Sequence, residues 1–370
     1  MFVGTNRGPG GTESHIVSMA KAMADAGHRV GAAVRRRDYI DKGLFADARI
    51  QRFPAKTFRG SWDIRAAASV AKACRNFRPQ VIVGSFEREY LAAMLIARQM
   101  GALYTLFRHL DDRYLPTTRL AMRYADIVIV PSHFSRGRVI EIGVPAAAVF
   151  VLYNAVDTSR FRPDQYSRAR ARQDLGVSDD EVVVSFFGRF EAEKGVFILS
   201  RALELAMARC PLIRPLWVGQ GKEIVNLKAI VESSPGASRP LWRPWTEDVS
   251  GLMCASDVVV LPSIVNETFG RVMIEAQACG VAVLGSDLGG IPETMRSGIT
   301  GRLVPAGDVA AWADAIVALA DSSATRRALG SAGRDFAATT FDPAVIARQF
   351  TDLLEGFSSA KGFSGGRHQC

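Results

Sequence analysis

Short runs of β-branched residues alternate with Ala- and Leu-rich segments along most of the chain, and this alternation constrains its fold more than any other feature. Hydrophobic strands that follow one another between helices indicate parallel sheets covered by helices on both faces. The segments between the runs, such as Leu91–Met100 and Leu199–Ala208, have helical patterns. The predicted fold class is therefore α/β. The five clearest strand runs are Val81–Val83, Ile127–Val130, Val182–Val184, Val258–Leu261 and Val281–Leu284.

The chain has 370 residues, which is more than one hydrophobic core usually organises. Two segments also resemble each other, since Asp126–Ser132 and Asp257–Ser263 each place an acid before a buried strand and a Pro-Ser pair after it. We therefore expect two domains of the same doubly wound type. Ligands of such sheets bind beyond the carboxyl ends of the strands. Two facing domains would then hold a ligand in the cleft between them.

The boundary between the domains is expected near residues 155–180. The segment Arg160–Arg172 is polar and charged and contains a proline, as linkers do. The predicted N-terminal domain covers residues 1–158, and the predicted C-terminal domain covers residues 159–340. The first strand has only three residues before a Gly-rich loop, which leaves open whether that strand is clipped.

The end of the chain has a helical pattern followed by a polar tail. Residues 341–357 are predicted to form an amphipathic helix that stops at Gly356 and packs back across the domains. Residues 358–370 are rich in Gly and Ser, and we expect them to form a flexible tail.

The net charge of +9 is unevenly distributed. Residues 1–150 contain 23 Lys and Arg against 12 Asp and Glu, whereas residues 151–370 contain 23 against 25. The densest basic segments are Arg35–Arg37 and Lys56–Arg78. A basic N-terminal domain suits an anionic membrane surface or a phosphorylated acceptor. An ordinary solvated surface would give the same composition.

Several classes of protein are not expected from the sequence. It contains no zinc-finger, RNP or basic-zipper pattern, so we do not expect nucleic acid as a partner. The five cysteines are dispersed and odd in number, which disfavours disulfides and a zinc site. No apolar run reaches the roughly 18 residues of a spanning helix, and no signal peptide precedes the Gly-rich loop. The sequence thus predicts a cytoplasmic protein, with association at the inner face of the cell membrane as a further option.

The segment Glu267–Glu275 has one acid on each side of a predicted helix start, Glu267 before it and Glu275 after it. The free N–H groups at such a start, around Phe269 and Gly270, form an anion site. Carboxylates repel phosphate but accept hydrogen bonds from sugar hydroxyls. The pattern therefore suits a ligand that carries hydroxyl groups on both sides of a diphosphate. A loop acid and a surface helix acid would show the same spacing.

Three further loops follow predicted strands or open helices. The segment Phe187–Gly195 places Arg189 and Lys194 on a Gly-bounded loop, where two cations suit a diphosphate or are simply solvated. The loop Gly8–Ser14 is rich in glycine, which permits close approach of the backbone to a phosphate or simply makes a turn. The segment Arg108–Asp112 contains His109 and two acids, which favour a helix cap over a magnesium site.

Taken together, these segments resemble family 4 glycosyltransferases, which have the GT-B fold of two facing Rossmann-like domains. The similarity covers nearly the whole chain. Its most specific parts are Gly188-Arg189…Lys194-Gly195, Gly219-Gln220-Gly221 and Glu267…Glu275. In the N-terminal half, Gly10-Gly11, His109, Pro131-Ser132 and Asn154–Asp157 fit the same pattern.

The resemblance implies a role for each matching residue. Arg189 and Lys194 bind the donor diphosphate, Glu275 accepts from the ribose hydroxyls, and Glu267 contacts the transferred sugar. Gly11 approaches the phosphate, and His109 lies near the sugar or the acceptor. The residues expected to be catalytic are His109, Arg189, Lys194 and Glu267. No metal ion is expected at the site. The residues expected to bind the donor are Gly10, Gly11, Gly188, Gly219, Arg243, Thr268, Phe269, Gly270 and Glu275.

The resemblance also implies an activity. We expect a retaining, metal-independent transfer of a hexose to a cell-surface polysaccharide, lipopolysaccharide or glycolipid acceptor. A UDP- or GDP-sugar would be the co-substrate, and no other cofactor is expected. The alternatives are a nucleotide-sugar 2-epimerase on the same fold and a non-catalytic protein that binds sugar nucleotides.

Overall fold

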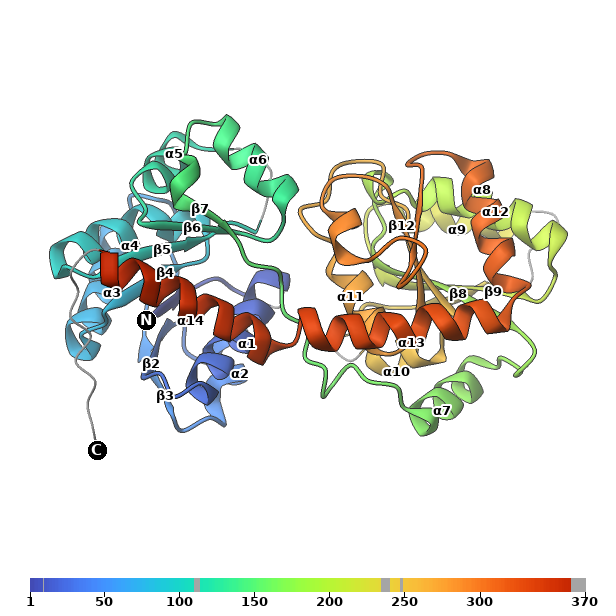
Figure 1. Cartoon of the computed structure of the whole chain (residues 1–370), viewed down its shortest axis with the longest axis horizontal. Coiled ribbons are helices and arrows are strands. Elements are labelled where there is room, and N and C mark those ends of the chain that lie inside the picture. Colours follow the sequence, from blue (N-terminus) through green and yellow to red (C-terminus); the bar gives the residue numbers. More distant parts are fainter. Residues whose placement is uncertain (9, 110–113, 234–239, 247–248, 361–370) are drawn as a thin grey trace. The chain divides into compact units, whose positions relative to one another are not determined.

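The computed structural model describes residues 1–8, 10–109, 114–233, 240–246 and 249–360. The chain divides into two compact units. Unit 1 comprises Met1–Ala155 and the segment that begins at Pro343, and unit 2 comprises Val156–Asp342. Each unit contains one parallel β-sheet flanked by helices (Figure 1), which is the Rossmann-like α/β fold predicted from the sequence.

The sheet of unit 1 has the strand order β3-β2-β1-β4-β5-β6-β7. The short strand β1 lies in its centre and pairs with both β2 and β4. The strands are β1 (Phe2–Gly4), β2 (Val30–Val34), β3 (Ile50–Pro54), β4 (Val81–Gly84), β5 (Leu103–Phe107), β6 (Ile127–Val130) and β7 (Val149–Val151). The helices are α1 (Gly11–Asp25), α2 (Tyr39–Phe45), α3 (Ile64–Phe77), α4 (Glu87–Met100), α5 (Pro116–Arg123), α6 (His133–Glu141), the 3-10 turn η1 (Ala146–Ala148) and α14 (Pro343–Ala360).

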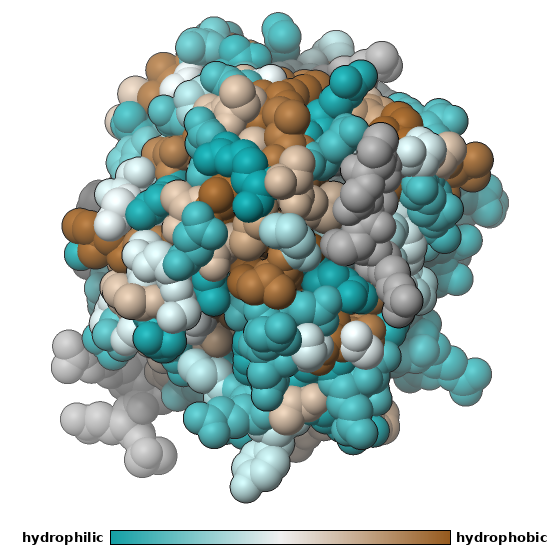
Figure 2. Space-filling model, turned by 90° about the vertical axis from the view of Figure 1, so that its right-hand side faces the viewer, coloured by the Kyte–Doolittle hydropathy of each residue, from teal (hydrophilic) through white to brown (hydrophobic). Residues whose placement is uncertain are grey.

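The sheet of unit 2 has the strand order β10-β9-β8-β11-β12-β13. Its strands are β8 (Val182–Arg189), β9 (Ile213–Gln220), β10 (Leu241–Arg243), β11 (Val258–Leu261), β12 (Ala282–Ser286) and β13 (Arg302–Val304). Its helices are α7 (Gln165–Leu175), η2 (Ala192–Lys194), α8 (Val196–Arg209), α9 (Ile224–Ser233), α10 (Ser250–Ala255), α11 (Arg271–Ala278), η3 (Ile291–Thr294), α12 (Val309–Ala320) and α13 (Ser323–Thr340). Figure 2 shows a face on which hydrophilic residues are interspersed with hydrophobic ones, as is usual for the surface of a globular protein.

The internal similarity seen in the sequence corresponds to the same pair of aspartate hydrogen bonds at the amino ends of β6 and β11. The Asp126 N–H donates to the carbonyl of Tyr104, and its carboxylate accepts from the N–H of Tyr104 at 2.8 Å. Asp257 makes the same two contacts with Val183, the second also at 2.8 Å. Each aspartate therefore extends the pairing of its strand with a neighbouring strand by one residue.

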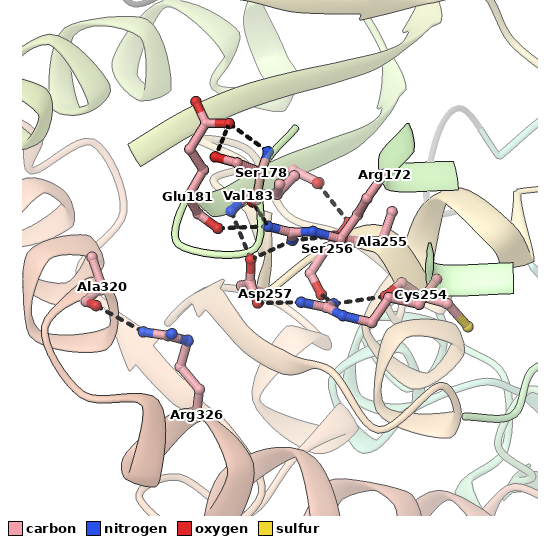
Figure 3. A network of polar contacts seen from close by, with 12 residues as sticks. Arg172, Ser178, Glu181, Val183, Cys254, Ala255, Ser256, Asp257, Ala320 and Arg326 are labelled. Atoms are coloured by element: carbon pink, nitrogen blue, oxygen red, sulfur yellow. Dashed lines mark hydrogen bonds and ion pairs between the residues drawn. The ribbon is translucent and has the colours of Figure 1, made fainter. Parts of the chain in front are cut away.

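The predicted linker at Arg160–Arg172 is wrong in its second half, which belongs to helix α7. Asp164 caps this helix by accepting from the N–H groups of Tyr166 and Ser167. The Arg172 side chain is only 3% exposed and pairs with Asp257 at 3.1 Å. It also donates to the carbonyls of Ala255, Ser178 and Glu181 (Figure 3). Charged residues in this segment thus serve the core of unit 2 rather than a linker.

The predicted stop at Gly356 is also wrong, because α14 continues to Ala360. This helix belongs to unit 1 and packs against α1 (Figure 1). The Phe350 ring contacts Phe107 at 5.4 Å, and His28 hydrogen-bonds Thr351 at 2.8 Å. Beyond the glycine, the Phe357 ring contacts Phe150 at 5.3 Å, so packing of one face maintains the helix through Gly356. The predicted tail of residues 358–370 is therefore wrong at its start, since residues 358–360 belong to α14, and residues 361–370 lie outside the described residues.

Unit 1 contains a buried acid beside its Gly-rich loop. The Glu89 side chain is 1% exposed, and its Oε1 accepts from both the N–H and the hydroxyl of Thr5, at 2.7 and 2.6 Å. Burial raises the pKa of Glu89 to about 7, although the hydrogen bonds from Thr5 oppose this shift. The end of β1 is thus held by a carboxyl group that ionises near neutral pH.

We expect substitution of Arg172 to destabilise unit 2 strongly. Arg172→Met leaves Asp257 and three carbonyls with fewer donors, and loss of one partner of a buried pair costs about 3 kcal/mol or more. The measurement is urea unfolding monitored by circular dichroism. The control is Arg170→Met on the exposed face of the same helix. Equal stability of the two variants would contradict the assigned role.

We expect Glu89→Gln to change the pH dependence of stability. The pKa of Glu89 is raised in the folded state from 4.5 to about 7, so its contribution to the free energy of unfolding is lost as pH rises across that range. The amide cannot ionise. The stability of the variant relative to wild type should therefore improve by about 2 kcal/mol between pH 5 and pH 8. Urea unfolding at both pH values measures this, and a difference independent of pH would refute it. Glu141→Gln, at an exposed site, serves as the control.

Candidate functional site

Four loops meet at the carboxyl edge of the sheet in unit 2. Backbone hydrogen bonds connect the loop after β8 to the loop after β9, since the Glu223 N–H donates to the carbonyl of Phe190 at 3.0 Å. The Ile264 N–H, in the loop after β11, donates to the backbone carbonyl of Glu193 at 3.0 Å. The Gly290 N–H, in the loop after β12, donates to the backbone carbonyl of Glu267 at 2.8 Å. The backbone of these loops is therefore fixed before any ligand binds.

Two glycines permit this close association. Gly195 has φ of 71°, and a Cβ atom there would lie 1.8 Å from the carbonyl oxygen of Pro262. At Gly219, with φ of 149°, a Cβ atom would lie 1.9 Å from the carbonyl oxygen of Gly188. No side chain fits at either distance. Gly195 and Gly219 are thus explained by close backbone contacts, the first between the loops after β8 and β11 and the second between strands β8 and β9.

Lys194 and Glu267 form an ion pair across two of these loops. The Lys194 Nζ lies 2.6 Å from Glu267 Oε1, and the two side chains are 19% and 17% exposed. The hydroxyl of Ser263 donates to the same oxygen at 2.6 Å. Ser263 is fully buried and fixes the orientation of the carboxylate.

Sequence reasoning did not identify Ser263 as a functional residue, although the repeated Pro-Ser pair contained it. In unit 1 the hydroxyl of the equivalent Ser132 has a different partner. It accepts from the Ser135 N–H and caps α6. The repeated Pro-Ser pair therefore identifies a turn after a strand. The partner of each serine hydroxyl depends on the residues packed around it.

Arg189 extends from the same loop as Lys194, and its side chain is 62% exposed. Its guanidinium lies 2.7 Å from Glu191 and 3.4 Å from Glu193. Exposed ion pairs of this kind contribute little to stability. An anionic ligand can therefore replace the acids beside Arg189 at low cost.

The second acid of the motif lies on α11. The Glu275 side chain is 15% exposed and pairs with Arg271, one turn earlier, at 3.1 Å. Burial raises the pKa of Glu275, and the nearby Arg271 opposes that shift. Gly270 is the N-cap of α11, with Thr268 half-buried in front of it. The Phe269 side chain is buried and packs on Phe341 at 5.7 Å, so only its backbone is placed for a ligand.

Arg243 has a structural contact that the sequence did not predict. It lies at the carboxyl end of β10, an edge strand of the sheet. Its guanidinium donates to the carbonyls of Trp242 and Asp174, both at 3.0 Å. Asp174 is in the last turn of α7, so Arg243 supplies a donor to the end of that helix.

The predicted site residues of unit 1 lie at the carboxyl edge of its own sheet. Gly10 is the N-cap of α1 and Gly11 is its first residue. His109 follows β5, and its ring stacks on Phe107 at 5.8 Å and meets His15 of α1 at 4.7 Å. The Gly-rich loop and His109 are thus connected through His15. The predicted cap at Asp111 and Asp112 lies outside the described residues.

Within the described part of the chain, no group of three or more His, Cys, Asp or Glu residues is arranged to hold a metal ion. What unit 2 provides is a fixed set of loops that carries two cations and two carboxylates. The cations suit a phosphate-bearing ligand, and the carboxylates suit its hydroxyl groups.

Comparison with known proteins agrees with this arrangement. Residues 9–160 match the family model described as Glycosyltransferase Family 4, and residues 181–322 match the model described as Glycosyl transferases group 1. The GDP-mannose-dependent alpha-(1-6)-phosphatidylinositol monomannoside mannosyltransferase of Mycolicibacterium smegmatis is 30% identical over 76% of this chain and 75% of its own length. The D-inositol 3-phosphate glycosyltransferase of Saccharomonospora viridis is 36% identical, but the alignment spans only 46% of its length and 51% of this chain.

Solved structures share the fold. Anabaena Alr3699/HepE, crystallised with UDP and glucose, has a TM-score of 0.80 at 24% identity, covering 96% of this chain and 98% of that one. WaaG, a glycosyltransferase involved in lipopolysaccharide biosynthesis, has a TM-score of 0.71 at 17% identity, covering 96% and 99%. Both family models and the mannosyltransferase relative lead to one conclusion: the chain is a glycosyltransferase and belongs to family 4, with the GT-B fold.

Proposed function

We propose that this glycosyltransferase transfers a hexose from a UDP- or GDP-sugar, with retention of configuration and without a metal ion or other cofactor. The observation that carries the proposal is the Lys194–Glu267 pair of 2.6 Å on fixed loops, with Arg189 beside it. One relative is named for GDP-mannose, and HepE was also crystallised with UDP-glucose. The two curated relatives are named a mannosyltransferase and a glycosyltransferase, which gives the 2-epimerase alternative no support.

The ion pair suggests how donor binding prepares the site. A diphosphate attracts Lys194 and Arg189 away from their carboxylate partners, because phosphate offers more negative charge and more acceptor oxygens. Glu267 is then free to accept from hydroxyls of the transferred sugar, while Ser263 keeps its carboxylate in place. Glu275 is assigned to the ribose hydroxyls.

Bond cleavage develops negative charge on the leaving diphosphate. Arg189 and Lys194 stabilise this charge as Mg²⁺ does in metal-dependent transferases. We assign retention to attack on the same face of the sugar, with the leaving phosphate taking up the acceptor proton. His109 is assigned to contact with the sugar or the acceptor.

For the acceptor we propose a cell-surface polysaccharide, lipopolysaccharide or glycolipid, reached at the anionic inner face of the cell membrane. Among the described residues, no helix combines the length and hydrophobicity that crossing a bilayer requires. The large apolar side chains that unit 1 exposes include Trp62 at 75% and Ile64 at 82%, with exposed Arg59 and Arg65 beside them. Apolar and basic side chains together suit the interface of an anionic membrane.

We expect release of nucleoside diphosphate from the donor to depend on an acceptor and to persist in EDTA. Glu275→Ala should raise the Kd of the donor about tenfold or more, since a charge-assisted hydrogen bond to the ribose is lost. Enzyme-coupled detection of the diphosphate and calorimetry measure the two effects. Glu204→Ala, on α8, serves as the control. Abolition of activity by EDTA would exclude the metal-independent reaction, and an unchanged Kd would exclude the role of Glu275.

We expect Trp62→Ser combined with Ile64→Ser to weaken binding to vesicles of phosphatidylglycerol and phosphatidylcholine by tenfold or more, because both side chains lose burial in the interface. Cosedimentation at several salt concentrations measures the effect. Tyr166→Ser in unit 2 is the control, since this side chain is 91% exposed. Equal binding of both variants would show that this surface does not meet the membrane.

A further inference from the structure

The ends of three neighbouring strands in unit 1 gather positive charge. The register pairs Gly4 of β1 with Val34 of β2, and Val34 with Pro54 of β3, so these strands end level with one another. The Ala55 N–H donates to the carbonyl of Val34 at 2.8 Å and continues the pairing past β3. The residues that follow at this edge are Arg7, Arg35, Arg36, Arg37, Lys56 and Thr57.

Two of these residues have buried polar atoms without a partner. The Arg35 Nη1 is buried and forms no hydrogen bond within the described residues, although its Nε lies 3.6 Å from Asp38. The hydroxyl of Thr57 is likewise buried and lacks a partner within the same described set. An unsatisfied buried donor costs free energy. The two residues lie on extensions of the paired strands β2 and β3, where a ligand with acceptor atoms would satisfy both groups.

The backbone around Arg35 is held in a fixed and strained form. Arg37 has φ of 61°, and its N–H donates to Asp41 at 2.8 Å. Asp38 accepts from the N–H groups of Gly8 and Tyr39, each at 2.9 Å, and so connects this turn to the loop after β1. Non-glycine residues in the left-handed region are uncommon, and strained backbone of this kind clusters at functional sites.

The charge of this edge remains positive when its acids are counted. Asp41 pairs with Arg52 at 2.7 Å, and Asp38 is the acid that faces Arg35. Burial acts to raise the pKa of Asp38, but its two backbone hydrogen bonds and the nearby Arg35 and Arg7 lower it overall. Arg36 and Lys56 are exposed. A ligand at this edge is therefore expected to be an anion.

We propose that Arg35 and Thr57 bind a phosphate group of the acceptor, with Arg7, Arg36 and Lys56 supplying further positive charge. A phosphate offers only acceptor oxygens, which match a guanidinium N–H and a hydroxyl. Its assignment to the acceptor rests on the proposed transfer reaction, whereas the binding itself does not. The phosphate belongs either to a free phosphorylated acceptor or to a lipid headgroup.

The test uses the full chain and two probes. Calorimetry with glycerol 3-phosphate reports a free phosphomonoester, and cosedimentation with phosphatidylglycerol in phosphatidylcholine vesicles reports a headgroup. Arg35→Ala and Thr57→Val should each weaken binding of at least one probe about tenfold. Arg35→Lys and Thr57→Ser should restore part of it, which separates contact with phosphate from loss of folding. Arg75→Ala removes an equal charge on α3 and should change binding less than twofold.

The outcomes separate this inference from the proposed function. Weakening with glycerol 3-phosphate supports a free phosphorylated acceptor, and weakening with vesicles alone supports a lipid headgroup. If Arg35→Ala and Thr57→Val bind both probes as the wild type does, or if the wild type binds neither, the inference is overturned. Arg189→Ala should leave both probes unaffected. Loss of either probe in this variant alone would assign the phosphate to unit 2, and the donor site would stand without the site at Arg35.

Discussion

The contact between Lys194 and Glu267 connects the loops after β8 and β11, and the function proposed for unit 2 depends on it. It places a cation and a carboxylate 2.6 Å apart on backbone that hydrogen bonds and close glycine contacts have already fixed. In the proposed reaction, Lys194 binds the phosphate of the donor and Glu267 accepts from hydroxyl groups of its sugar. Since the loops are fixed in the free protein, little ordering is required when the donor binds.

The two units repeat one sequence pattern, in which the aspartates make the same contacts and the serines make different ones. Asp126 and Asp257 extend strand pairing in the same way, at the amino ends of equivalent strands. At the other ends, Ser132 caps a helix while Ser263 holds a carboxylate. In unit 2 the two cations, Lys194 and Arg189, are each paired with a carboxylate. Unit 1 presents a basic edge with buried donors at Arg35 and Thr57. This difference in charge fits a donor bound by one unit and a phosphorylated acceptor bound by the other.

Much of the fold could be predicted from the sequence. Continuous hydrophobic runs identify buried strands, and motif glycines identify places where the backbone turns or approaches another segment closely. The errors had tertiary causes. The segment around Arg172 has the composition of a linker, but its charges meet Asp257 and buried carbonyls that are far away in sequence. Gly356 ends a helix only where packing ends, and α14 continues along α1. Likewise, the roles of Ser263 and Arg243 depend on partners that no sequence spacing shows.

The central claim is that Lys194, released from Glu267, binds the donor diphosphate. The most direct measurement is thermal stabilisation by a panel of UDP-, GDP- and ADP-sugars in EDTA, compared between the wild type and Lys194→Met. The account predicts that one nucleotide class raises the Tm of the wild type and that this rise is largely lost in the variant, because ligand that binds only the folded state stabilises it. Equal stabilisation of both proteins, or none by any nucleotide sugar, would contradict it.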